Sequence, residues 1–112
     1  MESILTSIKK LLGYEEDETG FDEEIIMHIN TVLSDLTQLG VGPSEGFEIV
    51  DATDTWEEFI EDMRKFNSVK TYIYMRVKLI FDSSTMTSAL IESFKNQCDR
   101  FEWRLNHAAE YE

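Results

Sequence analysis

The side chains that could do chemistry in this sequence are mainly carboxylates, with two histidines and one cysteine. Glu24 and His28 stand four residues apart and would share one face of a helix, where they could hold a metal ion. A metal site needs at least a third protein ligand, and the other histidine, His107, lies near the opposite end of the chain. We interpret the pair as part of a solvated helix face.

Two acidic clusters could in principle serve a metal ion or a reaction. The first, residues 15–18, has the carboxylates that calcium prefers but lacks the spacing and the central glycine of an EF-hand loop. The second, residues 51–62, could supply paired carboxylates, although its spacing suits the polar face of a short helix better. The chain also lacks a phosphate-binding glycine loop, a nucleophile elbow and an HExxH pair. We therefore expect no enzyme activity, no cofactor and no metal site.

One basic segment interrupts the acidic background. Its five cations are Arg64, Lys65, Lys70, Arg76 and Lys78. Two tyrosines, Tyr72 and Tyr74, lie among them, as in surfaces that bind single-stranded nucleic acid. The five cations do not share one helical face, however, and the rest of the molecule would repel a polyanion. We therefore interpret the basic segment as a surface that contacts an acidic segment of a neighbouring copy.

Charge is divided unevenly along the chain. The 112 residues include 23 acidic and 10 basic side chains, and the net charge is −13. Residues 1–62 hold 17 acids and two bases, for a net charge of −15, whereas residues 63–112 hold six acids and eight bases, for +2. This balance argues against general nucleic-acid binding, because such proteins neutralise phosphates with clustered Lys and Arg.

The length and composition predict one folded domain, residues 1–112. No apolar stretch approaches the roughly 20 residues that a bilayer-spanning helix needs, and the N-terminal segment lacks the features of a signal peptide. We therefore expect no membrane partner. The only cysteine, Cys98, cannot form an internal disulfide and is expected to pack in the core.

Helical signals predominate along the chain. Gly13 and Gly40 are placed to end helices, Asp22 to begin one as an N-cap, and Thr55 with Glu58 to form a capping box. Apolar residues at helical spacing predict helices over residues 2–12, 22–39, 55–63, 66–81 and 86–108. The expected fold class is all-α: a small bundle of four main helices and one short helix, with a long C-terminal helix.

Residues 70–81 fit either a strand or a helix. Apolar and polar residues alternate there, which favours a strand, but a helical stripe runs through the same residues. The only candidate partner strand, residues 47–50, is short, and a long strand without a partner would be exposed at its edges. We therefore prefer a largely buried helix.

Several short stretches, taken in order, resemble the small head-tail connector proteins of tailed bacteriophages and prophages, particularly those of Gram-positive hosts. The stretches are FDEEII at 21–26, INT at 29–31, LGVGP at 39–43, Trp56, Phe59, VKTYIY at 69–74, LIFD at 79–82 and FEWRLN at 101–106. The resemblance covers nearly the whole chain, although Ser83 and Ser84 stand where the family is expected to have prolines.

The resemblance implies an all-helical structural virion protein, made in the host cytoplasm and located at the virion neck. It implies a dodecameric ring of identical subunits below the portal protein, which extends the DNA channel. It also implies a docking platform for the next protein of the neck, a head-completion (stopper) or tail protein. Under the same resemblance, residues 70–81 are expected to form a helix.

Electrostatics suggests where the charged residues of such a ring would lie. A channel through which viral DNA slides should not hold its phosphates. We therefore expect the acidic loop, which comprises Glu15, Glu16, Asp17 and Glu18, to face the channel or a neighbouring subunit's basic segment. On the long last helix and its tail, we expect Trp103, Arg104 and Tyr111 to dock on the portal. The alternative function is an acidic DNA mimic that inhibits a host DNA-binding enzyme.

Overall fold

The computed structural model describes residues 2–60 and 65–111, with side chains described as far as Leu105. Its elements are α1 (Ile4–Leu12), α2 (Asp22–Gln38), α3 (Trp56–Phe59), α4 (Phe66–Phe81), the 3-10 turn η2 (Ser83–Thr85) and α5 (Ser88–Tyr111). The described residues contain no strand, so the prediction of an all-α fold is confirmed. The helix expected over residues 66–81 is present with the predicted bounds.

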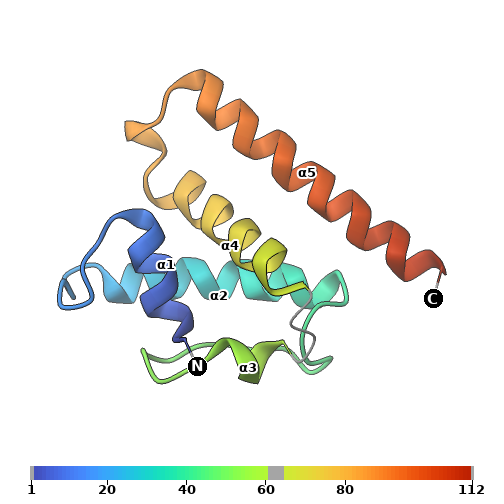
Figure 1. Ribbon diagram of the computed structural model, residues 1–112, viewed down its shortest axis with the longest axis horizontal. Coiled ribbons are helices and arrows are strands. Elements are labelled where there is room, and N and C mark those ends of the chain that lie inside the picture. The colour runs from blue at the N-terminus through green and yellow to red at the C-terminus, as the bar shows by residue number, and fades with distance from the viewer. Residues whose placement is uncertain (1, 61–64, 112) are drawn as a thin grey trace.

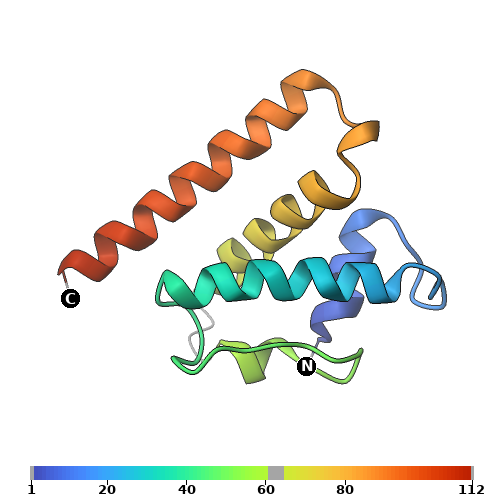
Figure 2. The same cartoon turned by 180° about the vertical axis from the view of Figure 1, so that it is seen from behind.

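Helix α4 lies at the centre of the molecule and contacts α1, α2 and α5 (Figures 1 and 2). The short α3 and the extended chain before it cover the opposite side of α1 and α2 from α5. Helix α5 is the outermost element, and its C-terminal part extends beyond the N-terminal start of α4. The molecule measures 43 × 35 × 20 Å, with the loop between α1 and α2 at one end of its long axis and the end of α5 at the other.

Local signals explain the limits of α1. The Ser3 side chain accepts a hydrogen bond from the backbone N–H of Thr6, so the helix begins at Ile4. At the other end Gly13 adopts a left-handed conformation with φ of 95°, and its N–H bonds the carbonyl of Lys10. The predicted C-cap is therefore confirmed.

Several predicted helix limits differ from the structure. Helix α1 begins at Ile4 rather than residue 2, α2 ends at Gln38 rather than residue 39, α3 begins at Trp56 rather than residue 55, and α5 ends at Tyr111 rather than residue 108. Asp22 is the first residue of α2 and not its N-cap, because its carboxylate pairs with Lys9 and leaves Phe21 in the cap position. Helix α3 ends at Phe59, since Ile60 is extended with φ of −125°; residues 61–63 of the predicted helix lie outside the described residues. Helix α5 begins at Ser88 rather than at residue 86, because residues 83–85 form the 3-10 turn.

The core lies where α1, α2, α3 and α4 meet. Trp56 is fully buried, and its indole N–H donates a 3.0 Å hydrogen bond to the hydroxyl of Ser7 on α1. The Ser7 hydroxyl in turn donates to the Ser3 carbonyl, so this buried polar pair is satisfied. The capping box is present as well, with the Glu58 carboxylate accepting a 3.0 Å bond from the N–H of Thr55. This box holds the start of α3 and places Trp56 in the core.

The segment 47–50 is extended but has no strand as its partner. The side-chain amide of Asn30 on α2 takes that role: it accepts a 2.8 Å hydrogen bond from the Ile49 N–H and donates a 3.0 Å bond to the Ile49 carbonyl. Ile49 is thereby held against α2 with 2% of its surface exposed. No helix in the described part of the chain is long and apolar enough to cross a membrane.

Candidate functional site

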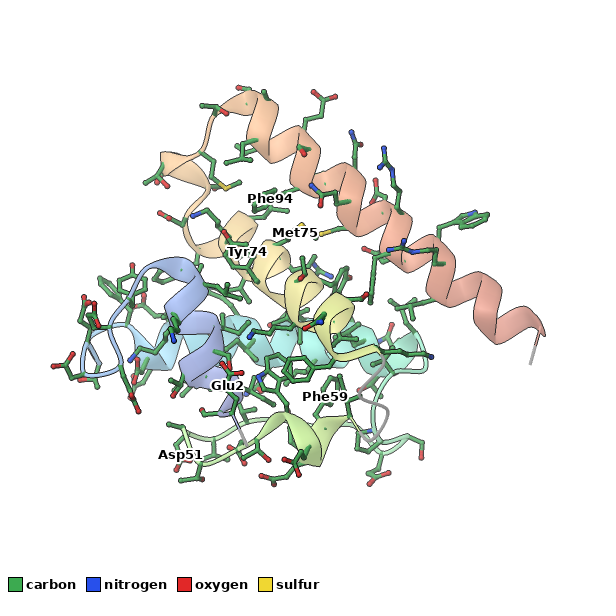
Figure 3. All side chains as sticks on the ribbon, in the orientation of Figure 1. Glu2, Asp51, Phe59, Tyr74, Met75 and Phe94 are labelled. Atoms are coloured by element: carbon green, nitrogen blue, oxygen red, sulfur yellow. The ribbon has the colours of Figure 1, made fainter. Side chains whose placement is uncertain are left out.

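Aromatic side chains join α5 to α4. The rings of Tyr72 and Phe101 stack with their centroids 4.8 Å apart. The rings of Tyr74 and Phe94 meet edge to face, with their centroids 5.9 Å apart. Figure 3 shows Tyr74, Met75 and Phe94 between the two helices. Cys98 is buried in the same interface, as predicted, and burial raises the pKa of its thiol to about 11. This cysteine is therefore a packing residue rather than a reactive thiol.

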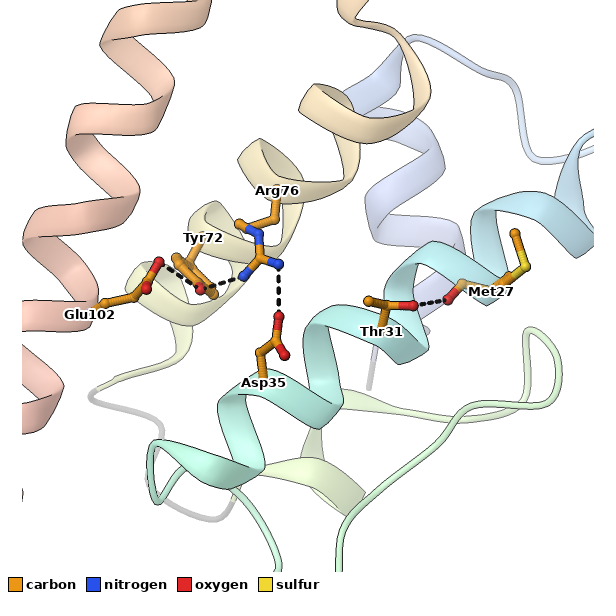
Figure 4. Close-up of polar contacts among 6 residues, drawn as sticks. All are labelled: Met27, Thr31, Asp35, Tyr72, Arg76 and Glu102. Carbon is orange, nitrogen blue, oxygen red and sulfur yellow. Dashed lines mark hydrogen bonds and ion pairs between the residues drawn. The ribbon is translucent and has the colours of Figure 1, made fainter.

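A chain of polar groups ties α2, α4 and α5 together (Figure 4). The Arg76 guanidinium donates a 2.7 Å hydrogen bond to the Asp35 carboxylate and another of 2.7 Å to the Tyr72 hydroxyl. The Tyr72 hydroxyl donates onward to the Glu102 carboxylate at 3.1 Å. Burial, with a smaller contribution from Glu102, raises the pKa of Tyr72 to about 12. For Arg76, the bonds to Asp35 and Tyr72 outweigh burial and raise the pKa.

The other members of the basic segment are placed as follows. Lys70 lies 3.6 Å from the Glu2 carboxylate, and Lys78 lies 3.5 Å from Asp82, the C-cap residue of the same helix. Lys65 is exposed at the start of α4, and Arg64 lies outside the described residues. Lys70, Arg76 and Lys78 thus have acidic partners within their own chain, and their contact with a neighbouring copy stays a prediction.

A groove of about 380 Å³ runs between α4 and α5. Its floor includes the buried Tyr72, Met75 and Phe101, and Arg100 and Arg104 lie along its α5 side. A smaller hollow continues it toward the start of α4. That hollow is lined by Lys65, Ser68, Val69, Phe101, Arg104 and Leu105. We call the two together the basic groove, because the charged residues that line it, among those described, are the cations Lys65, Arg100 and Arg104.

The acidic loop lies at the other end of the molecule and is held by a buried cation. Lys9 is only 3% exposed, and its ammonium donates a 3.0 Å hydrogen bond to the Glu16 carbonyl and pairs with Asp22 at 2.9 Å. Within the loop, the Glu18 carboxylate accepts a 2.8 Å bond from the Glu15 N–H. All four carboxylates of the acidic loop belong to exposed residues. The loop therefore presents negative charge from a fixed backbone.

Three aromatic residues, one of them exposed, lie beside the acidic loop. The rings of Tyr14, Phe21 and Phe81 contact one another at centroid distances between 5.7 and 6.2 Å. Phe21 is 49% exposed, and the His28 ring packs on Phe81 at 6.1 Å. We call the acidic loop and these aromatic residues together the acidic end. His28 thus serves packing, and no group of three or more potential metal ligands occurs among the described residues.

Several acids of the second cluster serve the backbone. The Asp54 carboxylate accepts bonds from the N–H groups of Val50 and Asp51, at 2.6 and 3.2 Å. Hydrogen bonds from the Thr53 hydroxyl and N–H lower the pKa of Asp51. Together with the Glu58 cap, these contacts show carboxylates that shape a turn and a helix start.

The three residues predicted to dock on the portal lie on α5. Trp103 is 59% exposed, and the Arg104 guanidinium lies 6.0 Å from the centroid of the Phe101 ring. The side chain of Tyr111 lies outside the described residues. The basic groove is not predicted from the sequence, because Lys65 lies far along the chain from Arg100 and Arg104. The one available signal is that Arg100 and Arg104 stand four residues apart and so share one face of a helix.

The comparison with protein families gives one result. A family model described as phage connector protein matches residues 4–112. No curated protein and no solved structure gives a significant match to the chain.

Proposed function

The chain belongs to the phage connector protein family, and from this premise we propose that it is a structural component of the virion neck, forming a ring below the portal protein. The observation that carries this proposal is the family match, which extends over residues 4–112 and therefore involves every helix of the fold. In this role the protein extends the DNA channel and offers a platform to the next head-completion or tail protein.

The shape of the molecule supports an adaptor. Helix α5 packs on α4 along one side and leaves its outer face exposed, with Leu90 40% and Trp103 59% exposed. A single helix that extends beyond the body of a domain can reach a partner that the body does not touch. We propose that Trp103, Arg104 and Tyr111 make the contact with the portal.

The charge of the chain supports passage of DNA without binding. Each phosphate that a cation neutralises releases counterions and adds affinity that a sliding duplex would have to break. With a net charge of −13, the subunit as a whole repels DNA. A ring whose lumen is lined by the basic segment would contradict this part of the proposal.

Imaging of purified portal with purified connector tests the proposal. Negative-stain electron microscopy should show portal particles that gain a coaxial ring of density, and portal alone is the control. A charge-matched acidic protein of similar size should add no density. Portal particles that remain unchanged at saturating connector would contradict the proposed function.

A further inference from the structure

We propose that the basic groove between α4 and α5 binds the acidic end of a second copy of this chain. The inference rests on the proposed ring, because it names the surfaces through which neighbouring subunits would meet. It assigns the acidic loop to a subunit contact rather than to the channel wall.

The groove has the chemistry of a docking site for an acidic and aromatic surface. Its floor is formed by the edges of Tyr72, Met75 and Phe101, each less than a tenth exposed, and its charged lining residues are Lys65, Arg100 and Arg104. Among the residues that the structure describes, no carboxylate forms an ion pair with any of these three cations. In this respect the three groove cations differ from Lys70, Arg76 and Lys78, which have acidic partners within the chain.

The acidic end supplies the complementary features. Phe21 projects beside four exposed carboxylates, and the apolar Leu11 and Ile80, on neighbouring elements, are 44% and 45% exposed. Apolar area rimmed by charge is typical of a protein contact surface. The exposed carboxylates of the acidic end match the exposed cations of the groove in charge, and Phe21 gives the acidic end an apolar group that the hollow can receive.

The positions of the two surfaces favour a ring over a closed pair. The acidic end lies at one end of the long axis, whereas the start of α4 and the C-terminal half of α5, which line the groove, lie toward the other (Figures 1 and 2). A contact between two different surfaces of identical subunits is heterologous and leaves one surface of each kind unused in a dimer. Repetition of that contact closes into a ring when the rotation between subunits allows it.

Variants with one added cysteine test the contact without the portal. Asp17→Cys and Arg100→Cys proteins are mixed at high concentration under mild oxidation, and disulfide-linked heterodimers are measured. The matched control replaces Arg100→Cys by Lys95→Cys, since Lys95 is also an exposed cation of α5 but does not line the groove. The native Cys98 is buried and contributes little background.

The expected result is a heterodimer yield several-fold above that of the control pair and above either variant alone. A yield equal to the control overturns the proposal. Because the portal is absent, this outcome is separate from failure of portal binding, which would count against the proposed function instead.

Charge reversal tests the nature of the contact. Arg100→Glu should reduce the cross-linking of Asp17→Cys to a reporter cysteine placed at Ser68 in the groove, and Lys95→Glu should not. Adding Glu16→Lys to the protein that carries Asp17→Cys should restore the yield of cross-linked heterodimer. A folding defect caused by Arg100→Glu would not be rescued in this way. A cross-linking yield that falls with Arg100→Glu and does not recover with Glu16→Lys overturns the proposal. Binding of a short DNA duplex that Arg100→Glu abolishes also overturns it, because DNA would then be the occupant.

Discussion

Arg76 of α4 and Asp35 of α2 form a 2.7 Å ion pair across 41 residues of sequence. The same guanidinium bonds the Tyr72 hydroxyl, which reaches Glu102 on α5. One cation therefore couples the central helix to helices on both of its sides. The sequence predicts a contact of Arg76 with a neighbouring copy. In the folded chain its charge is paired within the subunit, where it helps to hold α5 on α4.

Replacing Arg76 by alanine should lower the free energy of unfolding by about 1–2 kcal/mol. Hydrogen bonds to charged groups contribute about 1.5–3 kcal/mol, reduced here because Asp35 is partly exposed to solvent. Urea unfolding measures the change. Lys78→Ala is the control, since its longer, partly exposed i,i+4 pair with Asp82 should contribute about 0.5 kcal/mol or less. Equal losses in the two variants would contradict the network.

Tyr72 should make stability fall at high pH. The pKa of its hydroxyl is raised from 10.0 to about 12 in the folded chain, so the unfolded chain loses this proton first. The contribution is complete below about pH 10 and is lost as pH rises toward about 12. Urea unfolding between these pH values should therefore show a smaller pH slope for Tyr72→Phe than for the natural chain. Parallel curves would show that Tyr72 does not titrate differently in the two states.

Asn30→Ala should release the extended segment 47–50. The substitution removes both hydrogen bonds to Ile49 and leaves its backbone groups without their partner, at a cost of about 1–3 kcal/mol. Hydrogen exchange of the Ile49 amide should accelerate more than exchange in α4. The neighbouring Thr31→Ala is the control, because Thr31 is exposed and bonds only the Met27 carbonyl of its own helix (Figure 4). Unchanged Ile49 exchange would contradict the assigned role.

Gly42→Ala should destabilise the chain more than Gly46→Ala. Both glycines have positive φ, of 83° and 95°, so both substitutions cost about 1–2 kcal/mol of backbone strain. Only at Gly42 would the added methyl group also collide with a side chain, the ring of Phe59 in the core. The free energy of unfolding, measured by thermal unfolding, should be lower for Gly42→Ala than for Gly46→Ala by about 1–3 kcal/mol. Equal midpoints would show that Phe59 moves aside without cost.

Deleting residues 107–112 should abolish portal docking and leave the domain folded. The packing of α5 on α4 uses Phe94, Cys98 and Phe101, all of which remain. Circular dichroism and urea unfolding check the fold, and co-sedimentation with portal checks docking. A companion variant, Trp103→Ala in the full chain, should weaken docking with little change in stability. Retained docking by the truncated chain would contradict the assignment of the α5 end.

The sequence predicted the helices well because most of their signals are local. Gly13, the Thr55 and Glu58 box and the apolar stripe of α5 all act within a few residues. Helix α4 was ambiguous for a physical reason. It is packed on several sides, so Tyr72, Ile73, Met75 and Val77 are all buried and the pattern mixes the helical period with alternation.

The candidate surfaces could be predicted only in part, because their partners are distant in sequence. Nothing local indicates that Asn30 pairs with Ile49, or that Arg76 meets Asp35. Nothing in the sequence distinguishes Lys9 from an ordinary basic residue of α1, yet it is buried and its ammonium binds the backbone of the acidic loop. The basic groove arises from two helices brought side by side, so its three cations become a group only in the folded chain.

A cryo-EM reconstruction of purified portal saturated with this connector tests the proposed ring most directly. We predict a closed ring of connector subunits, coaxial with the portal, with α5 directed toward the portal and an opening wide enough for duplex DNA. A reconstruction in which the portal carries no added ring, or in which the subunits bind as isolated copies on its outer wall, would contradict the proposed ring.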